Sequence, residues 1–144
     1  MKNITKILRA SVAAVVAILS LVSLNSCQEM ASSAIEEAVE EVNQQCPFNV
    51  GNGLICDRVY VSGKSVVFSY LSEDSNVIDG INILGSTATD LVFEELQSLA
   101  RVDDNLKTMI ELCVEAEYNI TYTYSDYSGR SASVTITHSE LSLI

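Results

Sequence analysis

The sequence contains no tryptophan, one proline, one histidine and six glycines in 144 residues. So few glycines exclude a collagen-like chain, and a hydrophobic fraction of 48% excludes an intrinsically disordered one. A packed core is therefore expected. A chain of this length is enough for one modest domain.

Residues that could carry catalysis or hold a metal are also scarce. His138 is the only histidine and the sequence has no CxxC pair, so a zinc site has too few ligands. Ser139 and Glu140 adjoin His138 on a predicted strand, where successive side chains point to opposite faces and cannot form a relay. Residues 103–105 lack the spacing of a calcium loop, and helix capping explains them. The GxSxG, HExxH, P-loop and GxGxxG motifs are missing too, so we predict neither an enzyme nor a cofactor site.

Basic residues are few, because eight Lys and Arg stand against 19 Asp and Glu, which gives a net charge of −11. Nucleic acid and anionic lipid surfaces repel such a chain, so nucleic-acid binding is excluded. Basic partners are attracted by long-range steering, which salt weakens. Plain solubility on a crowded surface is the commoner explanation of this charge.

Residues 1–26 have the layout of a secretory signal peptide. Three basic residues, Lys2, Lys6 and Arg9, precede an apolar run over residues 10–24. That run has about 15 residues, whereas a membrane-spanning helix needs roughly 20. A cleaved leader is therefore favoured over a retained signal anchor.

The end of this segment, Leu24-Asn25-Ser26-Cys27, resembles the lipobox of bacterial lipoproteins, with Leu at −3 and a small residue at −1 from the cysteine. Asn at −2 departs from the usual pattern. The resemblance implies removal of residues 1–26, a diacylglyceryl thioether on Cys27 and an acyl chain such as palmitate on the new amino terminus. Each buried methylene of such chains contributes about 0.8 kcal/mol to membrane binding. The alternative is an ordinary signal peptide followed by a chance cysteine.

Gln28 stands where inner-membrane lipoproteins of enteric-type bacteria carry Asp, so the resemblance implies an outer-membrane anchor in the cell envelope, on its periplasmic or surface face. Removal of residues 1–26 would take away three of the eight basic residues and no acidic residue, leaving 118 residues with a net charge of −14. The membrane partner is then reached through the lipid on Cys27.

Three other cysteines remain for an oxidising compartment. Cys46 and Cys56 flank residues 47–55, whose Pro, Gly and Asn residues predict a tight loop. We therefore predict a Cys46–Cys56 disulfide, which contributes about 3 kcal/mol in the chain-entropy model. Cys113 falls on the apolar face of a predicted helix and is expected in the core as a small hydrophobe. Its pairing with either of the other two is the alternative.

The sequence after the leader divides into two parts. Residues 27–46 are predicted to hold the lipidated cysteine, a spacer and an amphipathic acidic helix with Ser33 as its N-cap. Pro47 disfavours helical geometry at the preceding residue and ends that helix. Residues 47–144 are predicted to form one α+β domain.

Two hairpins and a helical segment are predicted within that domain. Alternating β-formers predict the first hairpin over residues 55–71 and the second over residues 118–138. Helical spacing predicts one helix from a capping box at Thr87 and Asp90 and another from Asp103 or Asp104 to about residue 117, which could form one bent helix. Residues 72–86 fit either a short strand or a collapsed loop.

This order predicts an α+β fold with a four-stranded antiparallel sheet, made of the two hairpins, and helices packed on one face. The order resembles small secreted bacterial lipoproteins that are grouped as domains of unknown function. The resemblance covers about residues 54–140 and rests on the Val-Tyr-Val and Val-Val-Phe-Ser-Tyr strands of the first hairpin and the tyrosine-rich second hairpin. It implies no catalytic residues.

The tyrosines supply one binding hypothesis. If the sheet face opposite the helices is uncovered, they would form an aromatic binding face, because tyrosine is favoured in recognition surfaces. The candidate residues are Tyr60, Tyr118, Tyr122, Tyr124 and Tyr127. The alternative, which we favour, places Tyr122 and Tyr124 in the core with Ile120.

The function predicted from the sequence is that of a membrane-anchored, non-catalytic binding or accessory lipoprotein. Its expected partner is a basic protein or a glycan, and not a nucleic acid. The alternative is an inhibitor of a basic host or periplasmic enzyme such as a lysozyme or a protease. Known lipoprotein inhibitors of lysozyme are all-β, so the predicted helices count against that alternative.

Overall fold

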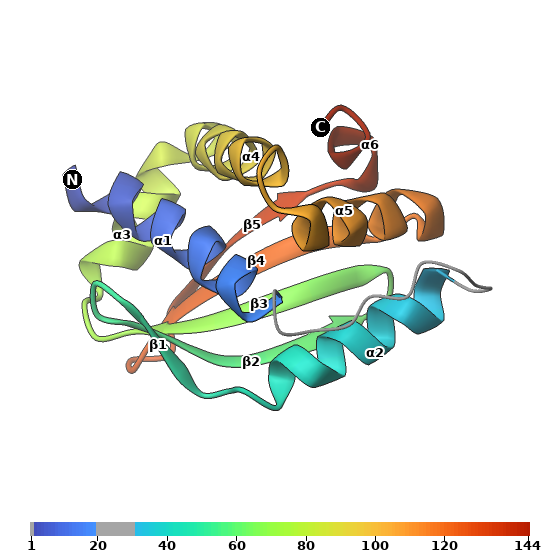
Figure 1. The fold of residues 1–144 in the computed structure, drawn as a ribbon. Helices are drawn as coiled ribbons and strands as arrows, with labels where there is room; N and C mark the ends of the chain where they lie inside the picture. Colours follow the sequence, from blue (N-terminus) through green and yellow to red (C-terminus); the bar gives the residue numbers. More distant parts are fainter. Residues whose placement is uncertain (1, 20–30) are drawn as a thin grey trace.

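The computed structural model describes residues 2–19 and 31–144. Within these ranges the chain forms six helices and five strands (Figure 1). In chain order they are α1 (Lys2–Leu19), α2 (Ala31–Asn43), β1 (Phe48–Gly51), β2 (Leu54–Ser62), β3 (Ser65–Ser72), α3 (Asn76–Leu84), α4 (Ser86–Ala100), α5 (Asp104–Ala116), β4 (Asn119–Asp126), β5 (Ser131–Ile136) and α6 (His138–Leu141).

The five strands form one mixed sheet in the order β1-β2-β3-β4-β5. Neighbouring strands are antiparallel except for β3 and β4, which are parallel and pair Ser65 with Asn119 and Ser72 with Asp126. The α+β class is confirmed, but the prediction of four antiparallel strands is wrong. After β3 the chain passes through three helices and re-enters the sheet at the end where β3 began. Strand β4 therefore runs parallel to β3, and the two hairpins join through this parallel pair.

The extra strand, β1, lies in the segment predicted to be a loop. Phe48 pairs with Cys56, Asn49 with Ile55 and Gly51 with Leu54, so only residues 52 and 53 form the turn. Gly51, Asn52 and Gly53 have positive φ, between 56° and 88°, which glycine and asparagine tolerate.

The described helices differ from their predicted starts in three places. Helix α2 begins at Ala31, so Ser33 lies inside it and is not its N-cap. Residues 72–86, undecided between strand and loop, contain α3, which buries Val77, Ile78 and Ile81. Helix α4 begins directly after Gly85 and has no side-chain cap, so the expected box at Thr87 is not formed.

Of the other local predictions, the start of α5 is confirmed and the end of the last strand is corrected. Asp103 caps α5 by accepting a hydrogen bond from the Leu106 N–H at 2.8 Å. Helices α4 and α5 are separate, with residues 101–103 between them. The last predicted strand ends at Ile136, two residues early, because Thr137 and Glu140 form a capping box that starts α6.

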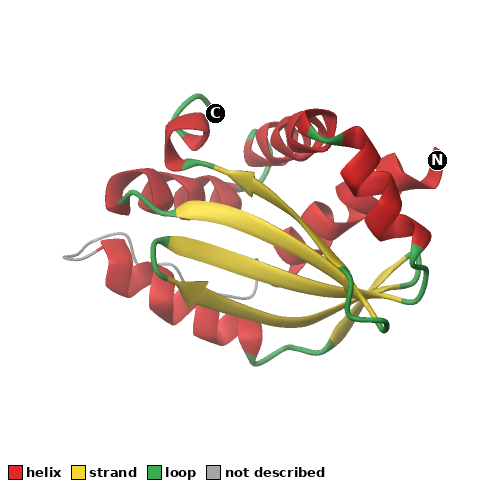
Figure 2. Cartoon of the chain, turned by 180° about the vertical axis from the view of Figure 1, so that it is seen from behind, coloured by secondary structure: helices red, strands yellow, loops and turns green. Residues whose placement is uncertain are grey.

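The helices lie on one side of the sheet, as predicted from the sequence. Figure 2 shows the opposite face of the sheet uncovered. In β4 the buried residues alternate with partly exposed ones, so Ile120, Tyr122 and Tyr124 face the helices while Thr121 and Thr123 face outward.

Helix α1, the described part of the predicted leader, packs into the same core. It lies mainly against α4 and also contacts α2, α5, β1, α3 and β2 (Figure 1). Its buried face consists of Ile4, Ile7, Leu8, Val12 and Val16. No helix among the described residues is long and apolar enough to cross a membrane.

The contact between α1 and α3 predicts how a substitution at Gly80 changes the stability of the protein. Alanine in the middle of a helix is more stable than glycine by about 0.5–1 kcal/mol. A Cβ on Gly80 would lie 2.6 Å from two side-chain carbons of Ile4, so Gly80→Ala in the full chain should bring no such gain. In an Ile4→Ala background the same substitution should raise the free energy of unfolding by about 0.5–1 kcal/mol, measured by urea denaturation. An equal effect in both backgrounds would contradict the packing of Ile4 on α3.

Candidate functional site

A row of aromatic rings crosses the two central strands on the helix side. The parallel register places Phe68 beside Tyr122 and Tyr70 beside Tyr124. The ring centroids of Phe68 and Tyr122 are 5.2 Å apart, and those of Tyr70 and Tyr124 are 5.4 Å apart. Tyr70 also stacks on Tyr122 at 6.4 Å, which makes the row continuous.

Two of these tyrosines carry their hydroxyl groups to α1. The Tyr70 hydroxyl donates a hydrogen bond to the carbonyl of Ser11. The Ser11 hydroxyl donates to the carbonyl of Leu8 at 2.7 Å and lies 2.6 Å from the Tyr124 hydroxyl. Since Ser11 has one hydroxyl proton and it is used on Leu8, Tyr124 is the donor to Ser11.

Burial keeps both phenols in the neutral, donating form. Tyr70 and Tyr124 are 0% exposed, and the loss of solvent raises the pKa of each well above its ordinary value. For Tyr70 the neighbouring phenol of Tyr124 raises the pKa further. Both therefore act as hydrogen-bond donors and not as bases at physiological pH.

The rim of this contact carries an ion pair. The Nε of Arg9 on α1 lies 3.8 Å from an oxygen of Glu95 on α4, and the Glu95 side chain is 22% exposed. We call the area under α1 the α1-binding surface and define it by Tyr70, Gly80, Glu95 and Tyr124. It combines an apolar body, two hydroxyl donors at the base and one carboxylate at the edge.

The predicted aromatic binding face is not assembled on the open side of the sheet. Tyr118, Tyr122 and Tyr124 are buried on the helix side, with 5% exposure or less. Tyr60 is half-buried with the Arg58 guanidinium 3.9 Å above its ring, and Tyr127 is 70% exposed after the end of β4. The alternation within β4 puts the large side chains on one face, and the helices cover that face.

Hydroxyl groups occupy the open face instead. Ser65 lies 2.8 Å from Thr121, Thr121 lies 3.0 Å from Thr135, and Thr123 lies 3.2 Å from Ser133, measured between side-chain oxygens. These cross-strand pairs satisfy one another. The alternation of Ser and Thr with large apolar residues in the second hairpin is the signal that could have predicted this face.

The two cysteines of the predicted disulfide lie close together. The sulfur atoms of Cys46 and Cys56 are 4.0 Å apart, and both cysteines are in the thiol form, whereas a disulfide requires about 2.05 Å. Burial raises the pKa of both thiols, and the carboxylate of Asp57 adds to the effect. Burial also raises the pKa of Cys113 to about 12. No described cysteine therefore has the lowered pKa of a nucleophile. Cys27 lies outside the described residues.

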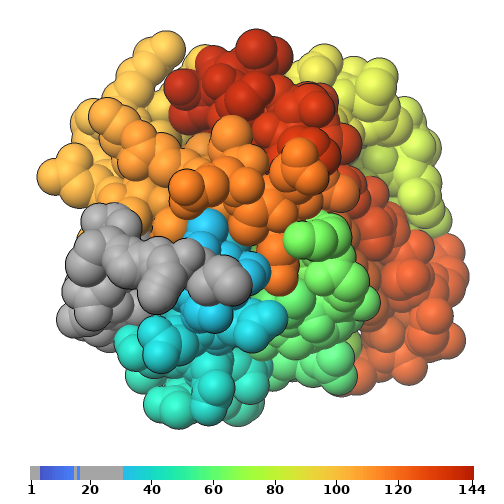
Figure 3. All heavy atoms as spheres, turned by 90° about the vertical axis from the view of Figure 1, so that its right-hand side faces the viewer, coloured from blue at the N-terminus to red at the C-terminus, as the bar shows by residue number. Residues whose placement is uncertain are grey.

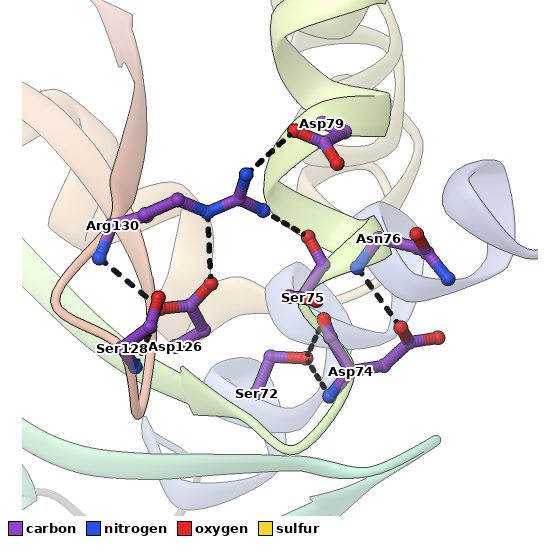
Figure 4. A network of polar contacts seen from close by, with 8 residues as sticks. All are labelled: Ser72, Asp74, Ser75, Asn76, Asp79, Asp126, Ser128 and Arg130. Atoms are coloured by element: carbon purple, nitrogen blue, oxygen red, sulfur yellow. Dashed lines mark hydrogen bonds and ion pairs between the residues drawn. The ribbon is translucent and has the colours of Figure 1, made fainter.

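An ionic cluster joins the turn after β4 to the start of α3 (Figure 4). The Nε of Arg130 lies 3.2 Å from Asp126 and its Nη1 lies 3.1 Å from Asp79, while Nη2 donates to the carbonyl of Ser75 at 2.8 Å. Asp126 also accepts hydrogen bonds from the hydroxyl and N–H of Ser128. The three side-chain nitrogens of Arg130 and the hydroxyl of Ser128 all donate within the cluster, so the cluster holds the turn in place.

His138 is engaged in a similar structural role. Its backbone N–H donates to the side-chain oxygen of Asn119 at 3.0 Å, and its ring Nδ1 lies 3.3 Å from the same oxygen. Glu140 is held by Thr137 in the capping box, so it does not form a pair with His138. Over the described ranges, no three metal-ligating side chains come together.

Two open hollows lie on the surface near the carboxyl terminus. One of about 560 Å³ is lined by α5 and the last residues of the chain, and one of about 500 Å³ lies between Arg101, Lys107 and Leu143. Figure 3 shows α5 in orange beneath the carboxyl-terminal segment in red on this side. The larger hollow mixes Lys107 with Glu111 and Glu115 and shows no convergent polar group.

Comparisons with known proteins show the fold alone. No protein family and no curated protein matches the sequence. A solved structure that is similar is that of a Pseudomonas aeruginosa protein described as secreted, with a TM-score of 0.57 and 8% identity. The match covers 80% of this chain and 99% of that protein.

Sequence reasoning did not find the contact between Ser11 and the tyrosines. Ser11 lies in the predicted leader, 59 positions from Tyr70 and 113 positions from Tyr124. The one local signal for this contact was the position of Ser11 within an apolar helix, because a hydroxyl group that is buried there needs a hydrogen-bond partner.

Asp126 predicts how stability depends on pH. Its hydrogen bonds, first from Ser128 and then from Arg130, lower the pKa of its carboxyl to about 2. Because the folded pKa lies below the unfolded value, the stabilisation is complete above about pH 4 and is lost as the pH falls from about 4 to about 2. Carboxyl NMR titration should give this midpoint, and Ser128→Ala should raise it. A wild-type midpoint near 4 would contradict the hydrogen bonding described here.

Proposed function

We propose that this protein is a lipid-anchored, non-catalytic binding or accessory protein of the bacterial cell envelope. The observation that carries the proposal is the lipobox-like sequence Leu24-Asn25-Ser26-Cys27 directly after a basic and apolar leader. Acyl chains on Cys27 would hold the domain at the outer membrane. An acidic spacer and the domain would then follow the anchor.

A location outside the cytoplasm has separate support. The similar solved structure belongs to a protein that is described as secreted. The two predicted disulfide cysteines lie close together, so an oxidising compartment would allow them to pair.

Binding is favoured over catalysis by the roles of the reactive side chains. The thiol pKa values are raised, His138 is tied to Asn119, and Asp126 is paired with Arg130. These groups stabilise the domain, and none is poised near another as an acid, base or nucleophile.

The acidic charge favours a basic partner. The processed chain would carry a net charge of −14, because processing removes three basic residues and no acidic ones. The same charge underlies the alternative of an enzyme inhibitor. The five-stranded sheet with its helices differs from the all-β inhibitors that suggested that alternative, so we favour the accessory role.

The anchor is tested by Cys27→Ala in the native host. The wild type should be found in the membrane fraction with an intact mass that begins at residue 27 and includes acyl chains, because the thioether on Cys27 precedes cleavage. The variant should be released or unprocessed. If the wild type and the variant are both soluble and are both cleaved at the same site, away from residue 27, Cys27 is an ordinary thiol.

The Cys46–Cys56 disulfide is tested on the same processed protein. After denaturation, alkylation without reductant should modify one thiol, Cys113, and reduction should free two more. Cys46→Ser should lower the free energy of unfolding by about 3 kcal/mol, because the cross-link no longer restricts the unfolded chain. Alkylation of three thiols without reductant, or a cross-link that contains Cys113, would contradict the pairing.

A further inference from the structure

The α1 helix covers an extended part of the domain. An α-helix of 18 residues is about 27 Å long and about 10 Å wide, so its footprint is roughly 270 Å². Five of its apolar side chains are 8% exposed or less within this footprint. Apolar patches of a few hundred Å² on soluble proteins are commonly interaction sites.

Removal of residues 1–26 would expose this surface, so the inference that follows rests on the proposed function. Tyr70 would lose the backbone carbonyl of Ser11 and Tyr124 would lose the Ser11 hydroxyl, which accept their hydrogen bonds in the described chain. Without α1 the two hydroxyls donate to water instead, and a bound molecule that covers them must bring acceptors of its own. The base of the surface therefore favours a ligand with acceptors at these two positions.

The edge of the surface selects for charge. Glu95 pairs with Arg9 at 3.8 Å and would lose that partner together with α1. A fatty acid would bring a carboxylate toward this acidic protein, whereas a basic side chain would replace Arg9. The surface is also shaped for the width of a helix and not for a single acyl chain.

We propose that, in the processed protein, the α1-binding surface binds an amphipathic helix of a partner protein. That helix presents an apolar stripe to α4, a backbone carbonyl to Tyr70, the hydroxyl of a small residue to Tyr124, and a basic residue to Glu95. The leader itself shows how such a helix is held, since Ser11 and Arg9 occupy these two positions.

The test uses the full chain with Cys27→Ser and a site-specific protease sequence in place of residues 20–26. After cutting, the released residues 1–19 are removed by gel filtration in urea and the domain is refolded. A labelled synthetic peptide of residues 2–19 is then the probe, and its fluorescence anisotropy is measured without detergent. The cut protein should bind the peptide saturably in a 1:1 ratio. The uncut protein is the matched control and should not bind it, because α1 occupies the surface.

Substitutions separate the proposed contacts from general stickiness. Tyr124→Phe should weaken binding about tenfold, because one buried hydrogen bond is lost. Tyr60→Phe makes the same chemical change on the open face and should leave binding unchanged. The Arg9→Glu peptide should bind more weakly at low salt, and the difference should shrink as ionic strength rises.

Four outcomes would overturn the proposal. The cut protein could lose its folded circular dichroism, which would make α1 a permanent core helix. It could stay folded and bind no peptide. It could bind palmitate in competition with the peptide, with the same affinity for palmitate in the wild type and in Tyr124→Phe. It could also form a dimer that buries the surface. The intact mass of the protein from its native host separates these failures from failure of the proposed function. A mass that begins at Met1 would show that the leader is kept, and it would overturn the proposed function independently of the peptide-binding result.

Discussion

Strands β3 and β4 lie side by side in parallel at the centre of the sheet, and the rest of the core is arranged around them. Their register brings the rings of Phe68, Tyr70, Tyr122 and Tyr124 into one stacked row. The three helices between the two strands must then cross a single face, which is the face that those rings occupy. The described residues leave the other face without such cover, and it bears hydroxyl groups that pair across the strands.

Local patterns predicted most of the elements but not their arrangement. The two hairpins follow from alternating β-formers around Gly63 and Gly129, and α2 follows from its apolar face. Helix α3 was missed because nine residues give too few turns to separate a helical period from a strand or a loop. Alternation assigns side chains to a face of their strand but does not say which strand lies next to it, so the parallel pairing had no sequence signal.

The same limit explains what could be predicted of the candidate site. The shared face of Tyr122 and Tyr124 was evident from their spacing, whereas the hydroxyl partner of Tyr124 lies on a helix from the other end of the chain. The proximity of Cys46 and Cys56 was predictable because only a short turn separates their elements. The lipobox resemblance concerns chemistry at Cys27, which is encoded in the order of residues and needs no fold.

The parallel pairing also sets the order in which the protein can fold. Ser65 pairs with Asn119, so the central contact of the sheet forms only after most of the chain has been synthesised. Contacts between distant segments slow folding because a long loop must close before any gain is made. The core therefore cannot be completed on the ribosome until the last hairpin has emerged.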